Sequence, residues 1–397
     1  MRKKIHNGKI ITPYRIMPVG CVCIEDGKIC EISEGDLPFA DAEIIDAKGN
    51  YVSPGFIDLH THGAGNSDFM DATVEACLQI AKMHAKYGTT GLYPTTLAST
   101  NEELFKTFEI YRQAKAKNTE GSAFLGFHLE GPYFAMNQKG AQDPRYICNP
   151  KPEHYMAILD ATDDIKRWSI APELEGSKEF AETLIKRGIM PAIAHSDAIY
   201  EEIVDAFDWG YTHVTHLYSC TSTVTRRSCF RYAGIIEAAY LIDGMTVEII
   251  ADGIHLPESL LKLIYKIKGP EKIALITDSM RAAGMPDGKS ILGSLANGME
   301  VLVEDGVAKL PDRTAFAGSV ATADRLVRNM RQLAGVPLPE TIQMITIIPA
   351  RIMGIDKTKG SLAKGKDADV VIFDENINVK MTMIDGKIVY NENNKKR

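Results

Sequence analysis

The stretch SPGFIDLHTHG, residues 53–63, joins an apolar, strand-like run to two histidines at its end. Side chains of a β-strand alternate between its two faces, so residues two apart share a face. Asp58, His60 and His62 are therefore expected to project the same way, with two imidazoles side by side. Two neutral imidazoles at this spacing form half of a site for a divalent transition metal. Further ligands from elsewhere in the chain are needed to complete such a site.

Apolar, strand-like runs recur after this stretch. Stretches typical of amphipathic helices lie between several of them, such as TVEACLQIAKMHAKYG and PESLLKLIYKIKG, and both of these end at Gly, a common helix stop. About eight short strands joined through helices predict an α/β fold, a (β/α)8 TIM-like barrel, over residues 53–357. The predicted strands are 56–62, 90–96, 123–130, 169–174, 190–196, 212–218, 247–255 and 272–279.

The two ends of the chain share a different pattern, of β-formers around turn dipeptides. Asn7-Gly8 and Asp26-Gly27 lie in the first part, and Asp385-Gly386 lies in the last. Each dipeptide is typical of a tight hairpin. Neither end holds enough residues for a stable sheet of its own. We therefore expect residues 1–52 and 358–397 to form one small β-sandwich domain together.

The composition is that of an ordinary globular protein. The protein has 397 residues, of which 45% are hydrophobic and 24% charged, and its formal net charge is −7. A net negative chain is not expected to have nucleic acid as its main partner. No apolar run is long enough for a membrane span, and the basic N-terminus lacks the pattern of a signal peptide. A cytoplasmic location is expected, with the seven scattered cysteines reduced.

Ionisable residues follow most of the predicted strands, at the end of a barrel where catalytic groups lie. A single His or Asp after a strand is commonly a cap or a turn former. Such residues at six strand ends together favour a metal site. His128 is expected to lie one layer deeper as a hydrogen-bonding neighbour, and His213 to face away as a structural residue. The strand-end residues are His60, His62, Glu130, His195, His216, His255 and Asp278.

The motifs as a set resemble those of the amidohydrolase superfamily and, within it, the N-acetylglucosamine-6-phosphate deacetylases. The resemblance covers nearly the whole chain. Glu130 stands where other amidohydrolases, such as dihydroorotases, use a carboxylated lysine, and this favours the deacetylase branch. The motifs that carry the resemblance are SPGFIDLHTHG, GFHLEGPY, KGAQ, IAHSD, VTHLYS, IIADGIH, LITDSMRAAGMPDG and AGSVATAD.

The resemblance implies a role for each strand-end residue. Glu130, His195 and His216 match the ligands of the family's principal metal. His60 and His62 match a pair that holds a second metal in some members, where the Glu matching Glu130 bridges both ions. Asp278 matches the catalytic aspartate, which also belongs to the expected metal-ligand set.

The implied reaction is hydrolysis of the acetamide of N-acetylglucosamine 6-phosphate to glucosamine 6-phosphate and acetate. His255 matches the histidine that contacts substrate near the scissile amide. A bound divalent cation lowers the pKa of water, and Asp278 would take its proton and pass it to the leaving amine. We expect two ions per chain, zinc first, with iron(II) or another divalent ion as the alternative.

The substrate-binding segments depart from the family's pattern. Ser219 and Cys220 begin a Ser-Cys-Thr sequence where relatives commonly have Asn-Ala-Met, and Gln142 replaces a His. In the family's dimers an Arg from the neighbouring subunit binds the phosphate, and Arg226 or Arg227 is the candidate here. A solvated loop is the alternative interpretation of these two arginines. Homodimerisation is expected on the resemblance alone.

Three other functions remain open from the sequence. One is a deacetylase of another N-acetylhexosamine, of the galactosamine type or without the phosphate. Another is an amidohydrolase that acts on another N-acyl amide, a cyclic amide or a nucleobase; Glu130 disfavours the cyclic amides. The third is a non-catalytic scaffold, which retention of the complete ligand set disfavours.

Overall fold

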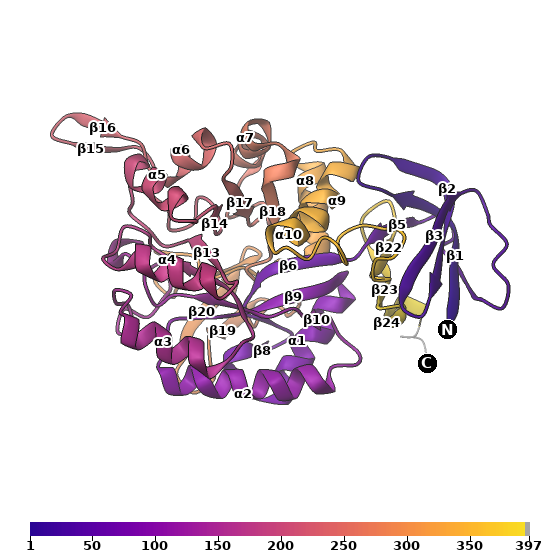
Figure 1. The fold of residues 1–397 in the computed structure, drawn as a ribbon, viewed down its shortest axis with the longest axis horizontal. Helices are drawn as coiled ribbons and strands as arrows, with labels where there is room; N and C mark the ends of the chain where they lie inside the picture. Colours follow the sequence, from indigo (N-terminus) through magenta and orange to yellow (C-terminus); the bar gives the residue numbers. More distant parts are fainter. Residues whose placement is uncertain (394–397) are drawn as a thin grey trace.

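The computed structural model of the protein describes residues 1–393, so residues 394–397 of the expected C-terminal β segment lie outside the described residues. Its main body is a barrel of parallel strands surrounded by helices (Figure 1). The strands follow one another around the barrel in chain order. They are β6 (Phe56–Thr61), β9 (Thr89–Thr96), β11 (Phe127–Glu130), β12 (Ile165–Ile170), β13 (Met190–Ile193), β14 (His213–Val214), β17 (Thr246–Ile249) and β18 (Ile273–Leu275).

The barrel is nearly closed between its last and first strands. Thr61 forms a parallel bridge with Ser279, and the backbone N–H of Asp278 donates to the carbonyl of His60 at 2.9 Å. The predicted (β/α)8 barrel is thereby confirmed. Closure also brings the end of the first strand, with its two histidines, directly beside Asp278.

Helices cover the outside of the barrel. Thr73 and Thr100 cap α1 and α2 by accepting backbone N–H groups, as short polar side chains do at helix starts. The helices are α1 (Val74–Lys86), α2 (Asn101–Lys117), α3 (Pro152–Ala161), α4 (Ser177–Lys186), α5 (Tyr200–Asp208), α6 (Ile235–Leu241), α7 (Glu258–Lys268), α8 (Ala323–Gln332), α9 (Leu338–Ile345) and α10 (Ile347–Ile352).

The two ends of the chain form one sheet beside the barrel, in the order β24-β23-β22-β5-β1-β2-β3, with β4 paired to β1 (Figure 1). Apolar side chains from both ends share one core, which confirms the β-sandwich built from both termini. Its strands are β1 (Arg2–Ile11), β2 (Ile16–Glu25), β3 (Lys28–Glu34), β4 (Glu43–Asp46), β5 (Tyr51–Pro54), β22 (Val370–Phe373), β23 (Val379–Ile384) and β24 (Lys387–Asn391).

Two local expectations were wrong. Asn7-Gly8 lies inside β1 at a register shift instead of in a hairpin; a Cβ on Gly8 would lie 2.5 Å from Val52 Cγ2, so the glycine permits close packing. The fourth barrel strand was expected at 169–174 but spans Ile165–Ile170. It contains Lys166 and Arg167. These two successive charged residues interrupt the apolar run by which the other barrel strands were recognised.

Smaller elements complete the described chain. A three-stranded sheet of β19 (Gly288–Leu292), β20 (Met299–Glu304) and β21 (Val307–Lys309) lies between β18 and α8 in sequence. A hairpin of β15 (Thr225–Arg227) and β16 (Phe230–Tyr232) projects from the body at the upper left of Figure 1. The remaining short elements are β7 (Gly63–Ala64), β8 (Ser67–Asp68), β10 (Ala123–Phe124) and single 3-10 turns at 69–71, 136–138 and 270–272.

Within residues 1–393, every helix is too short or too polar to cross a membrane.

Candidate metal centre and active site

The six expected ligands come from the ends of five strands and converge. Three of them, His195, His216 and Asp278, follow β13, β14 and β18 with positive φ angles of 47°, 29° and 46°. Non-glycine residues adopt this conformation at a cost of about 1–3 kcal/mol each, and such residues cluster at functional sites. The backbone is thus bent where each strand ends, which turns these side chains towards the barrel axis.

His60, His62 and Asp278 form the first group of donor atoms. The two Nε2 atoms are 3.2 Å apart, and each lies 3.3 Å from Asp278 Oδ1. The three atoms make a nearly equilateral triangle. A cation with bonds of about 2.0 Å in a tetrahedral shell has ligand atoms about 3.3 Å apart. The group therefore fits one face of such a shell, as the spacing of the two histidines predicts.

Glu130 joins this group to a second one. Its Oε2 lies 3.4 Å from His62 Nε2 and its Oε1 lies 3.6 Å from His60 Nε2. On the other side, Oε1 is 3.2 Å from His195 Nε2 and 2.8 Å from His216 Nε2. One buried carboxylate therefore contacts four imidazoles, which is the geometry of a ligand that bridges two sites.

The charges in the cluster perturb one another strongly. Burial alone would lower the pKa values of His60 and His62, but Asp278 and Glu130 raise them to about 9 and about 10. Burial alone would raise the pKa values of the two carboxyls, yet the surrounding histidines hold both below their usual range. The two carboxylates therefore favour protonation of His60 and His62. A divalent cation would take the place of those protons, because metal ligands must be deprotonated.

A cavity of about 260 Å³ opens over the cluster. His255 lies in its wall, and its Nδ1 donates to Asp252 Oδ2 at 2.8 Å. Phe316 packs on His255, with ring centroids 4.6 Å apart, and adds an apolar wall. Most of the expected substrate residues line this one cavity. They are Gln142, Ser219, Cys220 and His255, beside the metal-ligand candidates His62, Glu130, His195, His216 and Asp278.

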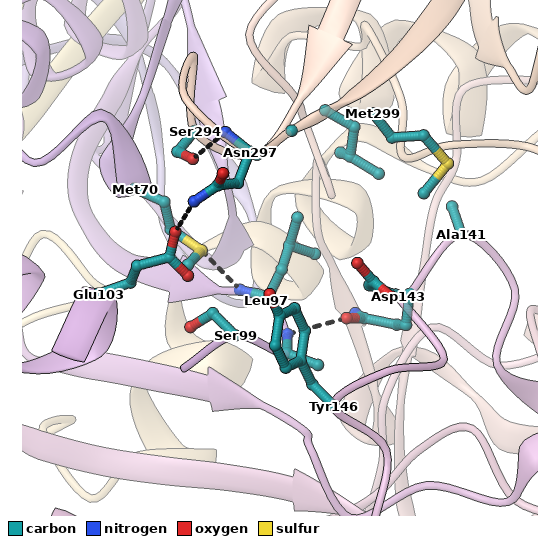
Figure 2. Close-up of a pocket in the computed structure, with 15 residues that line it drawn as sticks. Met70, Leu97, Ser99, Glu103, Ala141, Asp143, Tyr146, Ser294, Asn297 and Met299 are labelled. Carbon is teal, nitrogen blue, oxygen red and sulfur yellow. Dashed lines mark hydrogen bonds between the residues drawn. The ribbon is translucent and has the colours of Figure 1, made fainter. Parts of the chain in front are cut away.

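Gln142 is held by two hydrogen bonds. Its Nε2 donates to Glu130 Oε2 at 2.9 Å, and its Oε1 accepts from the backbone N–H of Ala98 at 3.0 Å. A second cavity, of about 60 Å³, is lined by Gln142 together with residues such as Leu97 and Met299 (Figure 2). Gln142 therefore lines both cavities and contacts the bridging carboxylate.

Arg226 and Arg227 lie elsewhere, on the projecting hairpin. Both are exposed, and neither lines the cavity over the cluster. The register pairs Arg226 directly with Arg231 across the two strands, while the guanidinium of Arg227 lies over the Tyr232 ring at 5.3 Å. Neither arginine of this hairpin therefore contributes to the cavity over the cluster in this chain.

Buried polar residues form a layer beneath the metal-ligand cluster. His128 bonds Ser169 at 2.6 Å and Thr95 at 3.2 Å, and its ring lies 4.5 Å from that of His60, the depth expected for it. His213 was expected to face away but lies in this layer, where it contacts Thr246 and lies 3.2 Å from Glu248 Oε1.

Sequence reasoning missed three polar residues around the site: Asp252, Arg167 and Glu248. Asp252 carries a signal in the motif IIADGIH, three residues before His255. Glu248 and Arg167 carry none, because their charges suggest exposure while both are fully buried.

Known proteins resemble this chain over nearly its full length. Residues 51–389 match the model of the amidohydrolase family. An N-acetylglucosamine-6-phosphate deacetylase of Lysinibacillus sphaericus is 33% identical over 94% of each chain. An N-acetylgalactosamine-6-phosphate deacetylase of Escherichia coli O157:H7 is 31% identical over 92% of this chain and 93% of the other.

Solved structures agree with the sequence comparison. The crystal structure of N-acetylglucosamine-6-phosphate deacetylase from Pasteurella multocida superposes with a TM-score of 0.89 at 29% identity, covering 98% of this chain and 99% of that one. The amidohydrolase family is metal-dependent, and the buried His, Glu and Asp groups can hold a metal. Sequence, fold and donor geometry together show that the chain belongs to the amidohydrolase family, in its N-acetylglucosamine-6-phosphate deacetylase branch.

Proposed function

We propose that the protein hydrolyses the acetamide of N-acetylglucosamine 6-phosphate to glucosamine 6-phosphate and acetate, in cytoplasmic amino-sugar catabolism. The observation that carries this proposal is the shared carboxylate of Glu130, which contacts four imidazoles at the base of an open cavity. Full-length similarity to deacetylases of hexosamine phosphates supports the same substrate class.

The proposal includes two zinc ions per chain, with iron(II) as the alternative. His60, His62, Asp278 and Glu130 would hold one ion, and Glu130, His195 and His216 the other. When bound, such a cation acidifies water and polarises a carbonyl oxygen. Metal analysis of the purified protein is expected to give about two divalent ions per chain, and a value near one would remove the second site.

Asp278 would act first as the general base and then as the general acid of the reaction. Its Oδ1 faces His60 and His62, which leaves its other oxygen to accept the proton of the attacking water. The same carboxyl would then donate that proton to the departing amine nitrogen. One carboxyl can serve both steps, because the nitrogen leaves from the atom that the water attacked.

His255 would stabilise the charge that develops on the acetyl oxygen. Asp252 accepts the Nδ1–H of His255 at 2.8 Å and fixes the orientation of the ring. A proton on Nε2 of that imidazole would donate to the oxyanion, an interaction that strengthens as the carbonyl oxygen gains charge.

The sugar would occupy the cavity beside Ser219, Cys220 and Gln142. Ser219 offers a hydroxyl, and Phe316 offers an apolar face against the sugar ring. For the phosphate we propose Arg226 or Arg227 from a second copy of the chain, since guanidinium binds phosphate through paired N–H groups. A homodimer follows from this assignment.

The decisive experiment measures acetate release from a panel of N-acetylated hexosamines. The panel contains the gluco and galacto epimers, each with and without the 6-phosphate. Turnover is expected with the phosphorylated gluco sugar and at least tenfold lower kcat/KM without phosphate. No turnover of any member would overturn the deacetylase proposal.

A second candidate substrate is N-acetylgalactosamine 6-phosphate. The 31% identity to a deacetylase named for that sugar favours it. The galacto epimer of the same panel decides between the two, because a preference for it would replace the gluco assignment and leave the chemistry unchanged.

A further inference from the structure

Glu248, on β17, is a fully buried carboxylate beneath the metal-ligand cluster. The structure engages only one of its two oxygens. Oε1 accepts a short hydrogen bond from Arg167 Nη1 and lies 3.2 Å from His213 Nε2. Oε2 is buried without a hydrogen-bond partner. A buried carboxylate oxygen without a hydrogen-bond partner destabilises the fold. A donor close to Oε2 would therefore be expected to bond to it.

His60 presents the matching group. Its Nδ1 is likewise buried without a hydrogen-bond partner, and it lies 3.7 Å from Glu248 Oε2. The side chains of both residues are fully buried. A hydrogen bond of ordinary length needs the two atoms to approach by about 1 Å, which a small rotation of the imidazole supplies.

We infer that Glu248 is the positioning partner of His60. The inference rests on the proposed metal site, in which Nε2 of His60 gives its lone pair to a cation. The proton of the neutral ring must then be on Nδ1, and Glu248 Oε2 is the acceptor that faces it. A carboxylate in this place fixes the ring's orientation and tautomer and makes Nε2 a stronger donor to the metal.

Arg167 keeps Glu248 in the required state. The guanidinium is fully buried and also donates to Thr215 Oγ1 at 2.6 Å, so it is fixed on two sides. A buried carboxylate stays ionised only when it is paired. Arg167 therefore holds the carboxylate charged and aims its free oxygen at His60.

Glu248 would support the binding of only one of the two proposed ions. The Nδ1 of His195 bonds the carbonyl of Gln138 at 2.8 Å instead, while the Nδ1 atoms of His62 and His216 lack a partner among the described residues. Loss of Glu248 should thus lower the binding affinity for the ion held by His60, His62 and Asp278. The affinity for the ion at His195 and His216 should be unchanged.

The test is zinc binding by metal-free protein, measured by calorimetric titration and by metal analysis after dialysis. Glu248→Gln keeps the size of the side chain and removes its charge. The expected result is a 10- to 100-fold loss of affinity for one ion and less than a threefold change for the other. Metal content after dialysis should then fall from two ions per chain to one.

Two further variants control for folding. His213→Gln alters a different neighbour of the same carboxylate and should leave both affinities within about threefold. Glu248→Asp keeps the charge but withdraws it from His60, and should reproduce the selective loss; it decides the matter if Glu248→Gln does not fold. Thermal melting of the metal-free proteins reports general destabilisation.

The outcomes separate this inference from the proposed function. Two unchanged affinities, or equal losses at both sites, overturn the inference. A wild-type protein that takes up one ion, unaffected by either Glu248 variant, overturns the inference and the two-ion proposal together. A selective loss in a protein that deacetylates no sugar sustains the inference and overturns the proposed substrate.

Discussion

At the scale of single residues, the site depends on backbone conformations that the rest of the structure must hold. Asp278 keeps its positive φ because its N–H donates to His60 and its carbonyl accepts from Ser319. His195 is similarly held, since its carbonyl accepts the N–H of Ala135 at 2.9 Å. Strained residues persist where surrounding bonds determine them, so these ligand positions are fixed before any cation binds.

The first prediction at this scale concerns Asp278→Asn. An amide cannot take the proton of water, so kcat should fall by at least about 10²–10⁴-fold, the range of general acid–base catalysis. Acetate release measures the loss. Metal analysis is the control and should show the ion at His195 and His216 retained. Residual activity within tenfold of wild type would mean that another group is the base.

At the scale of elements, helix α1 carries a buried histidine outside the metal cluster. His84 Nε2 lies 3.0 Å from Thr61 Oγ1 on β6, and burial lowers its pKa to about 4. The helix is thus locked to the first barrel strand through a neutral imidazole.

The folded and unfolded chains therefore bind protons differently at His84. In the unfolded chain the imidazole takes up a proton below its ordinary pKa of 6.5, while in the folded chain it stays neutral until about pH 4. The free energy of unfolding should fall by about 3 kcal/mol as the pH drops across this window. His84→Gln should remove this fall. Urea unfolding of metal-free protein at pH 7, 6, 5 and 4 measures it, and a difference between the two proteins that stays constant with pH would contradict the assignment.

The hairpin of β15 and β16 supports a prediction about phosphate binding. Arg226 stands directly opposite Arg231, and like charges at this position repel each other. A phosphate bound between them relieves the repulsion. Arg227 differs, because its guanidinium already lies over the Tyr232 ring. Arg226→Ala should therefore raise KM for the phosphorylated sugar about 10- to 100-fold, and Arg227→Ala should raise it less.

The control for this prediction is the sugar without phosphate. Neither variant should change its kcat/KM by more than about twofold, because the lost interaction involves only the phosphate. Equal effects on both sugars would show that the hairpin acts on the fold or on dimerisation instead.

At the scale of the whole molecule, the terminal sheet and the barrel share a core. Phe373 on β22 is fully buried, and its ring centroid lies 5.6 Å from Tyr51 and 6.3 Å from Phe56, the first residue of the first barrel strand. The last strands of the chain thereby support the strand that carries His60 and His62.

Phe373→Ala should lower the free energy of unfolding by about 3–5 kcal/mol, the usual loss for a buried phenylalanine. Denaturant unfolding measures it. Tyr14→Ala is the matched control, since Tyr14 is 88% exposed and its removal should change stability by less than about 0.5 kcal/mol. Equal effects would mean that the sheet and the barrel are not coupled through this contact.

The sequence by itself determined the order of the barrel strands, the pairing of the two ends into one sheet and the set of metal-ligand candidates. The periodicity of apolar residues is a local property, and strand ends are visible where it stops. Residues such as Glu130, His195 and Asp278 could therefore be placed at the end of the barrel without coordinates.

Only the tertiary structure decided which of these side chains face one another. Alternation along a strand gives the face of a residue and not its partner on a distant strand, so the double contact of Glu130 was expected only from the family resemblance and not from the spacing of residues. Arg167 and Glu248 were missed for the same reason: each charge is tolerated inside the barrel only because the other is there. Burial of a charged pair is a property of two strands brought together, and neither sequence segment shows it alone.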